Sequence, residues 1–343
     1  MALDPAQKAA AGRVLELIQM RLLSEALYVA ASLGVADSLA DGPKTAEALA
    51  ESSGADPVYL KRVLRALSQA GMFREEADGF ALAPMATFLQ RGVEGSLHSA
   101  ALLFGGEHAS RLVGLLLDCV KRGESAVHME FGGEWTNWVQ RNPEHAQLFN
   151  GVMTSYATLA MSGVLDAYDF SYASQLVDVG GGHGRVIADI LRRYPSMRGV
   201  LFDMPHAFAG GQATLANAGL SERCQVVSGD FFVSVPAGAD AYLLSRVLHD
   251  WTDSDAVRLL ANIRSAIVPY GRLIVLEAML GQEGKGMYPV LSDLNMMVRT
   301  GGCERTEAEY RAIFRAAGFE LTRAVPTTSP SGTAVIEGRP IAR

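Results

Sequence analysis

The chain has 343 residues, of which 49% are hydrophobic and 20% are charged, and its formal net charge is −7. This length predicts about two domains of an ordinary globular protein. The acidic balance argues against a broad surface for nucleic acid or for an anionic membrane, so we expect neither as a partner.

Cysteine usage and the N-terminus predict a reducing compartment. The 3 cysteines are far apart and form no Cys-x-x-Cys pair, which argues against a disulfide framework and against a zinc site. The sequence shows no basic leader segment and no run of about 18 uncharged apolar residues. We therefore expect a cytoplasmic protein without a membrane-spanning segment.

The first predicted element is a long helix over residues 14–39, interrupted at Gly34. Its apolar residues repeat at helical spacing but also cover neighbouring faces, with Leu15 and Ile18 on one face and Leu17 on another. A helix that is apolar on more than one face needs more than one neighbour. We therefore expect a partner subunit to cover part of this helix.

Residues 45–82 show the pattern of a winged helix. After a first helix, Asp56 is a good cap and Pro57 a good first residue for a second helix, and two short strands over 72–74 and 80–82 follow. This fold either binds DNA or serves as a packing module. The loop between the strands carries Glu75, Glu76 and Asp78. Because these carboxylates would repel phosphate, we favour the packing module.

Residues 84–166 are predicted to be mainly helical. The segment 149–156, which carries Met153 and Tyr156, mixes bulky and small side chains just before a glycine-rich region. Such a helix can cover a pocket, and a plain core helix is the alternative. The histidines of this half show no shared spacing of metal ligands, so we expect no metal site there.

The stretch 176–184 reads Leu-Val-Asp-Val-Gly-Gly-Gly-His-Gly. It predicts a buried parallel strand that ends in a tight turn whose backbone approaches a ligand, followed by a helix over 185–193. Unpaired amides at such a junction favour an anionic group. A dinucleotide fingerprint would need glycine where Arg185 stands. The remaining pattern, Gly-x-Gly-x-Gly after Asp178, resembles motif I of S-adenosylmethionine-dependent methyltransferases, and a turn of purely structural use is the alternative.

Strand and helix patterns alternate after this turn and predict an α/β fold with right-handed crossovers. The seven predicted strands span 176–179, 198–203, 224–230, 241–247, 272–278, 319–325 and 333–337. The last two form a terminal hairpin, so the sheet is expected to be mostly parallel with one antiparallel strand. Asp253 is predicted to cap a helix that begins near Ser254, and Thr306 and Glu309 are predicted to form a capping box.

Acidic residues follow two of these strands where a nucleoside would lie. Asp203 ends a strand 19 positions after Gly184, a spacing suited to accepting both hydroxyls of a ribose bound at the glycine turn. Its alternative role is to cap the helix after Pro205. Asp230 is placed to accept from an adenine amino group while Phe231 packs on the ring.

Five motifs occur in the order found in the plant-type small-molecule O-methyltransferases, a family that includes the caffeic acid and hydroxyindole O-methyltransferases. They are Asp-Val-Gly-Gly-Gly-x-Gly at 178–184, Leu-Phe-Asp-Met-Pro-His at 201–206, Gly-Asp-Phe-Phe at 229–232, His-Asp-Trp-Thr-Asp at 249–253 and Gly-Gly-Cys-Glu-Arg-Thr at 301–306. With the winged-helix pattern, the resemblance covers nearly the whole chain. It implies a Rossmann-like class I methyltransferase domain after a mainly helical winged-helix dimerisation domain, in a bacterial enzyme of secondary metabolism. It also implies a homodimer through the N-terminal helices, S-adenosylmethionine as methyl donor and no metal ion.

The resemblance further implies roles for individual residues. His249 looks like the catalytic base, and Glu277 and Glu304 look like the carboxylates that hold it. Cofactor contacts are implied for Asp178, Gly180, Gly182, Asp203, Asp230, Phe231, Ser245 and Arg246. Acceptor contacts are implied for Met153, Tyr156, Asp250, Trp251, Asn295 and Met296. The expected domains are a dimerisation domain over 1–100, a helical region over 101–165 that contributes to the acceptor pocket, and a catalytic domain over 166–343.

Elementary chemistry agrees with these roles. Methyl transfer is an in-line displacement at a carbon that the sulfonium already activates, so the protein must align an oxygen nucleophile and remove its proton. A histidine near pKa 6.5 is about 3.5 units short of a phenol near pKa 10, and a carboxylate on its far nitrogen narrows that gap. We therefore expect methylation of a phenolic hydroxyl on a small aromatic or polyketide-like molecule, with a helix-capping role for His249 as the alternative.

Three other functions stay open from the sequence. A relative of this fold can use S-adenosylmethionine for decarboxylation or hydroxylation. A winged-helix regulator that senses a small ligand would bind DNA in a salt-dependent manner. N-methylation is the alternative most similar to O-methylation, although an amine nucleophile needs less help from a base.

Overall fold

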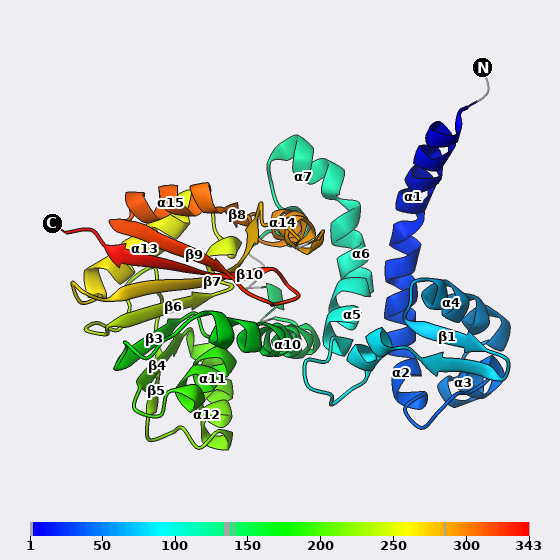
Figure 1. The fold of residues 1–343 in the computed structure, drawn as a ribbon, viewed down its shortest axis with the longest axis horizontal. Coiled ribbons are helices and arrows are strands. Elements are labelled where there is room, and N and C mark those ends of the chain that lie inside the picture. Colours follow the sequence, from blue (N-terminus) through cyan, green and yellow to red (C-terminus); the bar gives the residue numbers. More distant parts are fainter. Residues whose placement is uncertain (1–2, 134–137, 140, 285, 343) are drawn as a thin grey trace. The chain divides into compact units, whose positions relative to one another are not determined.

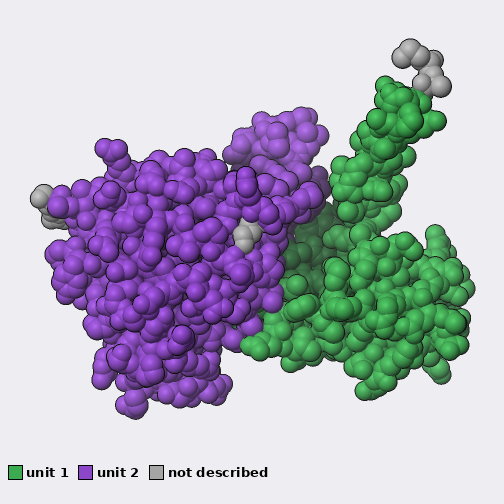
Figure 2. Space-filling view, viewed as in Figure 1, with its two compact units in different colours: residues 1–111, 142–155 green, residues 112–141, 156–343 purple. Residues whose placement is uncertain are grey.

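The computed structural model describes residues 3–133, 138–139, 141–284 and 286–342. The chain forms two compact units, coloured separately in Figure 2. Unit 1 contains residues 1–111 and 142–155, and unit 2 contains residues 112–141 and 156–343. Residues 101–165, expected as one helical region, therefore contribute to both units. None of the helices in the described ranges combines the length and hydropathy that crossing a bilayer requires.

Unit 1 contains the winged-helix elements that the sequence predicts. In chain order they are α1 (Pro5–Ser32), α2 (Val35–Ser38), α3 (Ala46–Ser53), α4 (Pro57–Gln69), β1 (Phe73–Glu76), β2 (Gly79–Leu82), the 3-10 turn η1 (Pro84–Leu89), α5 (His98–Gly105) and the start of α6 (Glu107–Gly114). Asp56 caps α4, as predicted, by accepting from the amides of Val58 and Tyr59 at 2.9 and 3.0 Å. Strands β1 and β2 pair in antiparallel fashion and form the wing.

Helix α1 begins at Pro5, earlier than the predicted start at residue 14. The reason is a capping box formed by Asp4 and Gln7, which the apolar pattern does not show. Large apolar side chains along the first part of α1 are between 45% and 67% exposed: Val14, Leu15, Leu17, Ile18, Met20 and Leu22. This helix therefore leaves apolar surface uncovered within the single chain.

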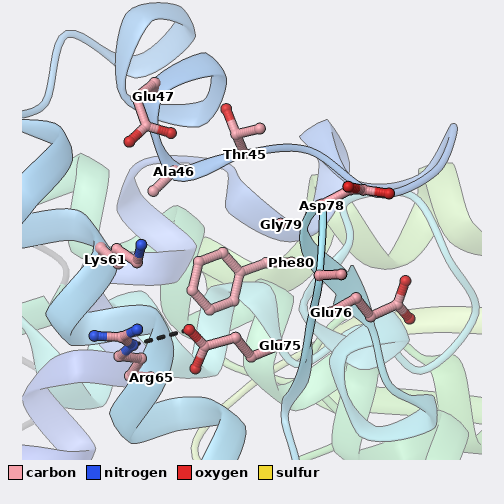
Figure 3. Close-up of a pocket in the computed structure, with 11 residues that line it drawn as sticks. Thr45, Ala46, Glu47, Lys61, Arg65, Glu75, Glu76, Asp78, Gly79 and Phe80 are labelled. Carbon is pink, nitrogen blue, oxygen red and sulfur yellow. Dashed lines mark hydrogen bonds and ion pairs between the residues drawn. The ribbon is translucent and has the colours of Figure 1, made fainter.

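An open hollow of about 540 Å³ lies beside the wing in unit 1 (Figure 3). Phe80 forms part of its wall, and Arg65 points toward Glu75 in an ion pair of 2.9 Å. Its charged lining residues are Glu47, Lys61, Arg65, Glu75, Glu76 and Asp78. Acidic groups outnumber basic groups among these residues, which is not the charge pattern of a surface for phosphate.

Unit 2 contains the predicted α/β sheet (Figure 1), with the strand order β5-β4-β3-β6-β7-β10-β9. The strands are β3 (Gln175–Val179), β4 (Arg198–Asp203), β5 (Cys224–Ser228), β6 (Ala241–Ser245), β7 (Arg272–Leu280), β9 (Phe319–Pro326) and β10 (Thr333–Pro340). All pairs on this path are parallel except those of β10, which runs antiparallel to both β7 and β9. The predicted architecture is therefore confirmed. The short strand β8 (Arg305–Thr306), which pairs with β7, is not predicted by the sequence.

Helices cover both faces of this sheet (Figure 1). On one face, α13 (Asp253–Ala266) and α15 (Glu307–Ala316) bury residues such as Leu260 and Phe314. On the other face, α11 (Arg185–Arg193), α12 (Phe208–Asn217) and the end of α10 (Pro143–Ala167) bury residues such as Ile190 and Val164. Further described elements are α7 (Leu116–Arg122), α8 (Ala126–Phe131), the 3-10 turns η2 (Pro205–Ala207) and η3 (Leu248–Asp250), and α14 (Tyr288–Arg299). The carboxyl ends of the parallel strands share one edge, and the loops with most of the predicted site residues begin there.

Candidate active site

The glycine turn lies between β3 and α11, as predicted. Gly180, Gly182 and Gly184 have φ values of 71°, 57° and 76°, a left-handed conformation that glycine adopts without steric cost. A Cβ at Gly180 would lie 2.9 Å from the side chain of Val247, so the turn packs closely against the segment after β6. A Cβ at Gly182 would meet nothing within 4 Å, so this part of the turn is open to a ligand.

Asp203 lies at the open part of the turn. It ends β4, is half-buried, and its Oδ2 accepts a hydrogen bond from the amide of Gly182 at 2.7 Å. Its Oδ1 accepts from the amide of Met204 at 2.6 Å. These two bonds fix the carboxylate beside the glycines.

Asp178 lies in different surroundings, and the cofactor contact implied for it stays a prediction. The residue is fully buried, and neither carboxyl oxygen makes a well-formed hydrogen bond to a described residue, although the Ile187 amide lies close enough to favour the charged form. A Cβ at Gly181 would lie 2.6 Å from its Oδ2, so the backbone of the turn covers the carboxyl group. Burial, and then the charge of Asp203, raise the pKa of Asp178 to about 7.

The residues expected at an adenine ring form an aromatic cluster. Phe231 contacts Phe232 and Trp251, with ring centroids 4.9 and 6.0 Å apart. Asp230 is exposed, and its Oδ1 accepts from the amide of Phe232 at 2.8 Å. Trp251, which the resemblance assigns to the acceptor pocket, therefore lies with the predicted adenine contacts. Its ring also packs against the hydrophobic core on the α13 and α15 face of the sheet.

His249 lies in η3 and is only 3% exposed. Its Nδ1 is 2.9 Å from Oε1 of Glu304 and 3.3 Å from Oε2 of Glu277. Glu277 belongs to β7 and Glu304 precedes β8, so three distant parts of the chain meet at one imidazole nitrogen. The structure thus brings together the three residues that the resemblance groups.

Both carboxylates are anchored by further hydrogen bonds. Oε1 of Glu277 accepts from the amides of Val247 and Leu248, each at 2.9 Å. Oε1 of Glu304 also accepts from the hydroxyl of Ser292 at 2.7 Å. These bonds fix the orientation of the carboxylates toward the imidazole and, through them, the orientation of the ring.

Electrostatics in this cluster favour a charged imidazole. Burial alone would lower the pKa of His249, but the carboxylates of Glu277 and Glu304, with that of Asp250, raise it to about 9. Burial raises the pKa of Glu277. Burial would also raise the pKa of Glu304, but the charge and hydrogen bond of His249 lower it below its ordinary value. The net result is an imidazolium held by an ionised carboxylate.

The ligand atoms of these three residues lie within 4.8 Å of one another, a spacing that a metal ion can bridge. The distance of 2.9 Å between Nδ1 and Oε1 of Glu304 also suits a shared proton. If the proton of the imidazole is on Nδ1 and directed at Glu304, that nitrogen has no lone pair for a metal ion. The geometry therefore fits a histidine with two supporting carboxylates.

Two residues without a role in the sequence analysis hold the His249 segment in place. Arg305 is 1% exposed and donates to the carbonyls of Leu248 and Trp251 at 2.9 and 2.8 Å. A Cβ at Gly302 would lie 2.1 Å from the carbonyl oxygen of His249. Arg305 and Gly302 both belong to the motif at 301–306, so this motif could have indicated their roles from the sequence.

The predicted cap of α13, Asp253, is wrong. Thr252 caps the helix by accepting from the amide of Asp255 at 3.3 Å. Asp253 instead forms an ion pair of 2.8 Å with Arg305. The predicted capping box of Thr306 and Glu309 is confirmed.

Part of the predicted acceptor pocket gathers around Tyr156. The guanidinium of Arg246, the residue after Ser245 at the end of β6, lies 4.9 Å from the centroid of the Tyr156 ring. The ring of Tyr288 meets Tyr156 edge-on at 6.3 Å. Arg246, for which a cofactor contact is implied, therefore lies beside a predicted acceptor residue.

The other predicted acceptor residues make contacts that do not involve Tyr156. Oδ1 of Asn295 accepts from Nε of Arg299 at 2.8 Å, one turn along α14. Met296 is buried on the same helix. Oδ1 of Asp250 is 3.9 Å from Nε2 of His249, the ring nitrogen opposite the two glutamates. Met153 belongs to unit 1, and its role stays a prediction.

Comparison with known proteins identifies the family. An O-methyltransferase domain matches residues 115–320, and an O-methyltransferase dimerisation domain matches residues 15–92. The chain belongs to the O-methyltransferases. Phenazine O-methyltransferase of Lysobacter antibioticus is 40% identical to it over 96% of each chain. The 8-amino-8-demethylriboflavin N,N-dimethyltransferase of Streptomyces davaonensis is 37% identical over 86% of each chain.

A solved structure supports the cofactor. Human N-acetylserotonin methyltransferase, crystallised with S-adenosylmethionine, is 26% identical and covers 99% of this chain and 100% of its own, with a TM-score of 0.86. This O-methyltransferase is therefore an S-adenosylmethionine-dependent enzyme, as the sequence predicts. Methyl transfer converts the cofactor to S-adenosylhomocysteine. The dimerisation domain of the enzyme supports the formation of a homodimer.

Gly302→Ala is expected to destabilise unit 2, because the new methyl group would overlap the His249 carbonyl and the segment must shift. Overpacking of this kind costs about 1–3 kcal/mol. The measurement is the melting temperature by calorimetry. The matched control is Gly114→Ala, where a Cβ meets nothing within 4 Å. Equal melting temperatures for the two variants would contradict the close approach at residue 302.

Proposed function

We propose that this enzyme transfers the methyl group of S-adenosylmethionine to a phenolic hydroxyl of a small aromatic or polyketide-like molecule, with His249 as general base. The observation that carries the proposal is the buried contact of His249 Nδ1 with Glu304 and Glu277, at 2.9 and 3.3 Å. A proton held on Nδ1 by carboxylates leaves the lone pair of the neutral ring on Nε2. That nitrogen is the one free to accept a proton.

The residues of unit 2 fit the cofactor. The open space at Gly182 suits the aminoacyl end, and the carboxylate of Asp203, which accepts from the Gly182 amide, has further lone pairs for the ribose hydroxyls. Asp230 and Phe231 suit an adenine ring, and we add Trp251 to this group because it contacts Phe231. When bound, S-adenosylmethionine supplies an activated methyl carbon.

The carboxylates make His249 a base of suitable strength. An isolated imidazole is about 3.5 pKa units weaker than a phenolate, or roughly 5 kcal/mol. With the pKa of His249 at about 9, the gap to a phenol near pKa 10 falls to about one unit. Once His249 is neutral, it therefore takes the proton from the hydroxyl at Nε2 at a cost of about one pKa unit, while Glu277 and Glu304 stabilise the imidazolium that forms.

N-methylation is the second candidate, because the riboflavin-type relative with 37% identity is named for it. The buried histidine with two carboxylates favours a hydroxyl acceptor, since an amine is already nucleophilic at neutral pH and needs less help from a base. A screen of phenolic and aromatic-amine acceptors with labelled S-adenosylmethionine, scored by product mass, separates the two.

His249→Ala should bind S-adenosylhomocysteine as the wild type does but lose methyl transfer by about 10² to 10⁴, the usual contribution of one general base. The measurement is initial rate with the best phenol from the screen. His128→Ala, an exposed histidine of α8, is the control and should keep its rate. A rate for His249→Ala within threefold of the wild type would remove the histidine from the mechanism.

The pH dependence follows from the raised pKa of His249. Only the neutral imidazole accepts a proton, so kcat/KM should rise with pH and level off above about pH 9. Glu304→Gln removes a negative charge that favours the imidazolium, so the rising limb should move to lower pH while the maximal rate falls. A rising limb that stays in place, or moves to higher pH, would show that Glu304 does not act on His249.

We also propose that α1 forms part of the dimer interface. Leu15, Ile18 and Leu22 lie along one face at helical spacing and are 65%, 67% and 66% exposed in the single chain. Burying these side chains against a second copy removes them from water, at about 25 cal/mol per Å² of apolar area.

Ile18→Glu should therefore shift the enzyme from dimer to monomer in sedimentation velocity, because the interface would bury an unpaired charge. Gln19→Glu adds the same charge to the neighbouring exposed position and should leave the dimer intact. A stable dimer in the Ile18→Glu variant would place the interface elsewhere.

A further inference from the structure

Tyr310 carries a buried hydroxyl that the packing of unit 2 does not explain. The residue lies near the start of α15 and is fully buried. Its ring belongs to the hydrophobic core on the α13 and α15 face of the sheet and meets the ring of Phe314 edge-on, with centroids 6.3 Å apart. Its hydroxyl is also buried and makes no hydrogen bond to a described residue. Because phenylalanine would fill the same core without burying a polar group, the hydroxyl needs another reason.

The alternation of β7 directs Glu277 toward the same core. Successive side chains of a strand point to opposite faces of the sheet. Val275 and Met279, two positions before and after Glu277, belong to the core on the α13 and α15 face. Ala334, which pairs with Glu277 on β10, belongs to it as well. Glu277 therefore points into the layer that holds Tyr310.

Glu304 reaches the same layer by a short path along the chain. Strand β8 follows Glu304 and pairs with the end of β7, and Thr306 then caps α15. Only five residues separate Glu304 from Tyr310. Burial, and then the charges of Glu277 and Glu304, raise the pKa of Tyr310. Both carboxylates are therefore close enough for their charges to act on the hydroxyl.

Each glutamate has one oxygen that can still accept a hydrogen bond. Oε2 of Glu277 contacts Nδ1 of His249 as an ion pair at 3.3 Å, but neither it nor Oε2 of Glu304 makes a hydrogen bond to a described residue. Arg305 also acts on Tyr310, but it offers only donors, which bond to backbone carbonyls and to a carboxylate of α13. The two glutamates are therefore the charged acceptors that suit the Tyr310 proton.

We propose that the Tyr310 hydroxyl donates, through one buried water molecule, to the carboxylates of Glu277 and Glu304. Such a water accepts one hydrogen bond and donates two, which satisfies all three buried atoms. The positive end of this chain stabilises the carboxylates most when the imidazole is neutral, so it favours loss of the Nε2 proton of His249. Tyr310 is thus a positioning residue for the proposed base. This inference rests on the proposed function, since it adds a residue to that same site.

Other charged and titratable groups surround the cluster from every element packed against it. They are Arg246 after β6, Asp250 of η3, Asp253 of α13, Asp293 of α14, and Cys303 and Arg305 on either side of Glu304. Replacing Tyr310 by phenylalanine changes none of these groups. A change in the pKa of His249 in that variant therefore reports the loss of one hydroxyl.

The test is the titration of His249 in the free, full-length enzyme, followed by nitrogen NMR of enzyme labelled at histidine. Tyr310→Phe should raise the pKa of His249 by at least about 0.3 unit, because a donor to the carboxylates is lost. Glu304→Gln, which removes a negative charge, should lower the same pKa. The rising limb of kcat/KM should move to higher pH in Tyr310→Phe.

Tyr242→Phe is the matched control. Tyr242 is fully buried in the same core, and its hydroxyl donates to the backbone carbonyl of Pro236 instead of facing the cluster. This variant should leave the pKa of His249 unchanged. Melting temperature and affinity for S-adenosylhomocysteine are measured for every variant, so that a general change of the core is recognised.

Three results would overturn the inference. In Tyr310→Phe the pKa of His249 falls, or rises by less than about 0.3 unit. Tyr242→Phe raises this pKa as much as Tyr310→Phe does, which would make the effect a general one of the core. Tyr310→Phe does not fold, which would give the hydroxyl a structural role.

The titration also separates this inference from the proposed function. The NMR measurement needs no turnover, so it decides the role of Tyr310 even if His249→Ala keeps its rate. A pKa that rises in Tyr310→Phe without a matching move of the kcat/KM limb would keep Tyr310 in the cluster and remove His249 as the base.

Discussion

The contact between one imidazole nitrogen and two buried carboxylates is the interaction on which the site depends. Two carboxylates buried alone would raise each other's pKa and lose their charge. The charge of His249 counters this, and the glutamates in turn raise the pKa of His249 to about 9. Each partner therefore stabilises the charged form of the others, and the proposed base catalysis starts from the form in which Nε2 of His249 has lost its proton. The arrangement exists only because adjacent strands β6 and β7 and the start of β8 bring the three segments to one place.

The rest of unit 2 extends from this contact along the carboxyl edge of the sheet. The glycine turn and Asp203 lie after β3 and β4, and the aromatic cluster of Phe231 and Trp251 follows β5. His249 follows β6, and Arg246 of the same segment lies over the ring of Tyr156. A cofactor bound along that edge and an acceptor at its end would meet at His249. The chemical groups of the site therefore follow one another along the sheet edge in the same order as the strands that precede them.

Sequence reasoning predicts the strands, the glycine turn and the grouping of His249 with Glu277 and Glu304. It fails where the role of a residue depends on the direction in which its side chain points. Asp178 lies within one apolar strand and Asp203 ends another, and the turn covers the first carboxylate while the second lies beside its open part. Trp251 contacts Phe231 and Phe232, which the spacing of the motifs does not encode. Arg305 is a surface-type residue by composition, and its burial depends on carbonyls supplied by a segment more than fifty residues earlier.

The most direct test of the central claim is a titration of His249 itself. Nitrogen NMR of enzyme labelled at histidine, assigned with His249→Ala, reports both the pKa and the ring nitrogen that carries the proton. The account predicts a pKa near 9 in the free enzyme, with the proton of the neutral ring on Nδ1. A titration near the ordinary value of about 6.5, or a neutral ring protonated on Nε2, would contradict it.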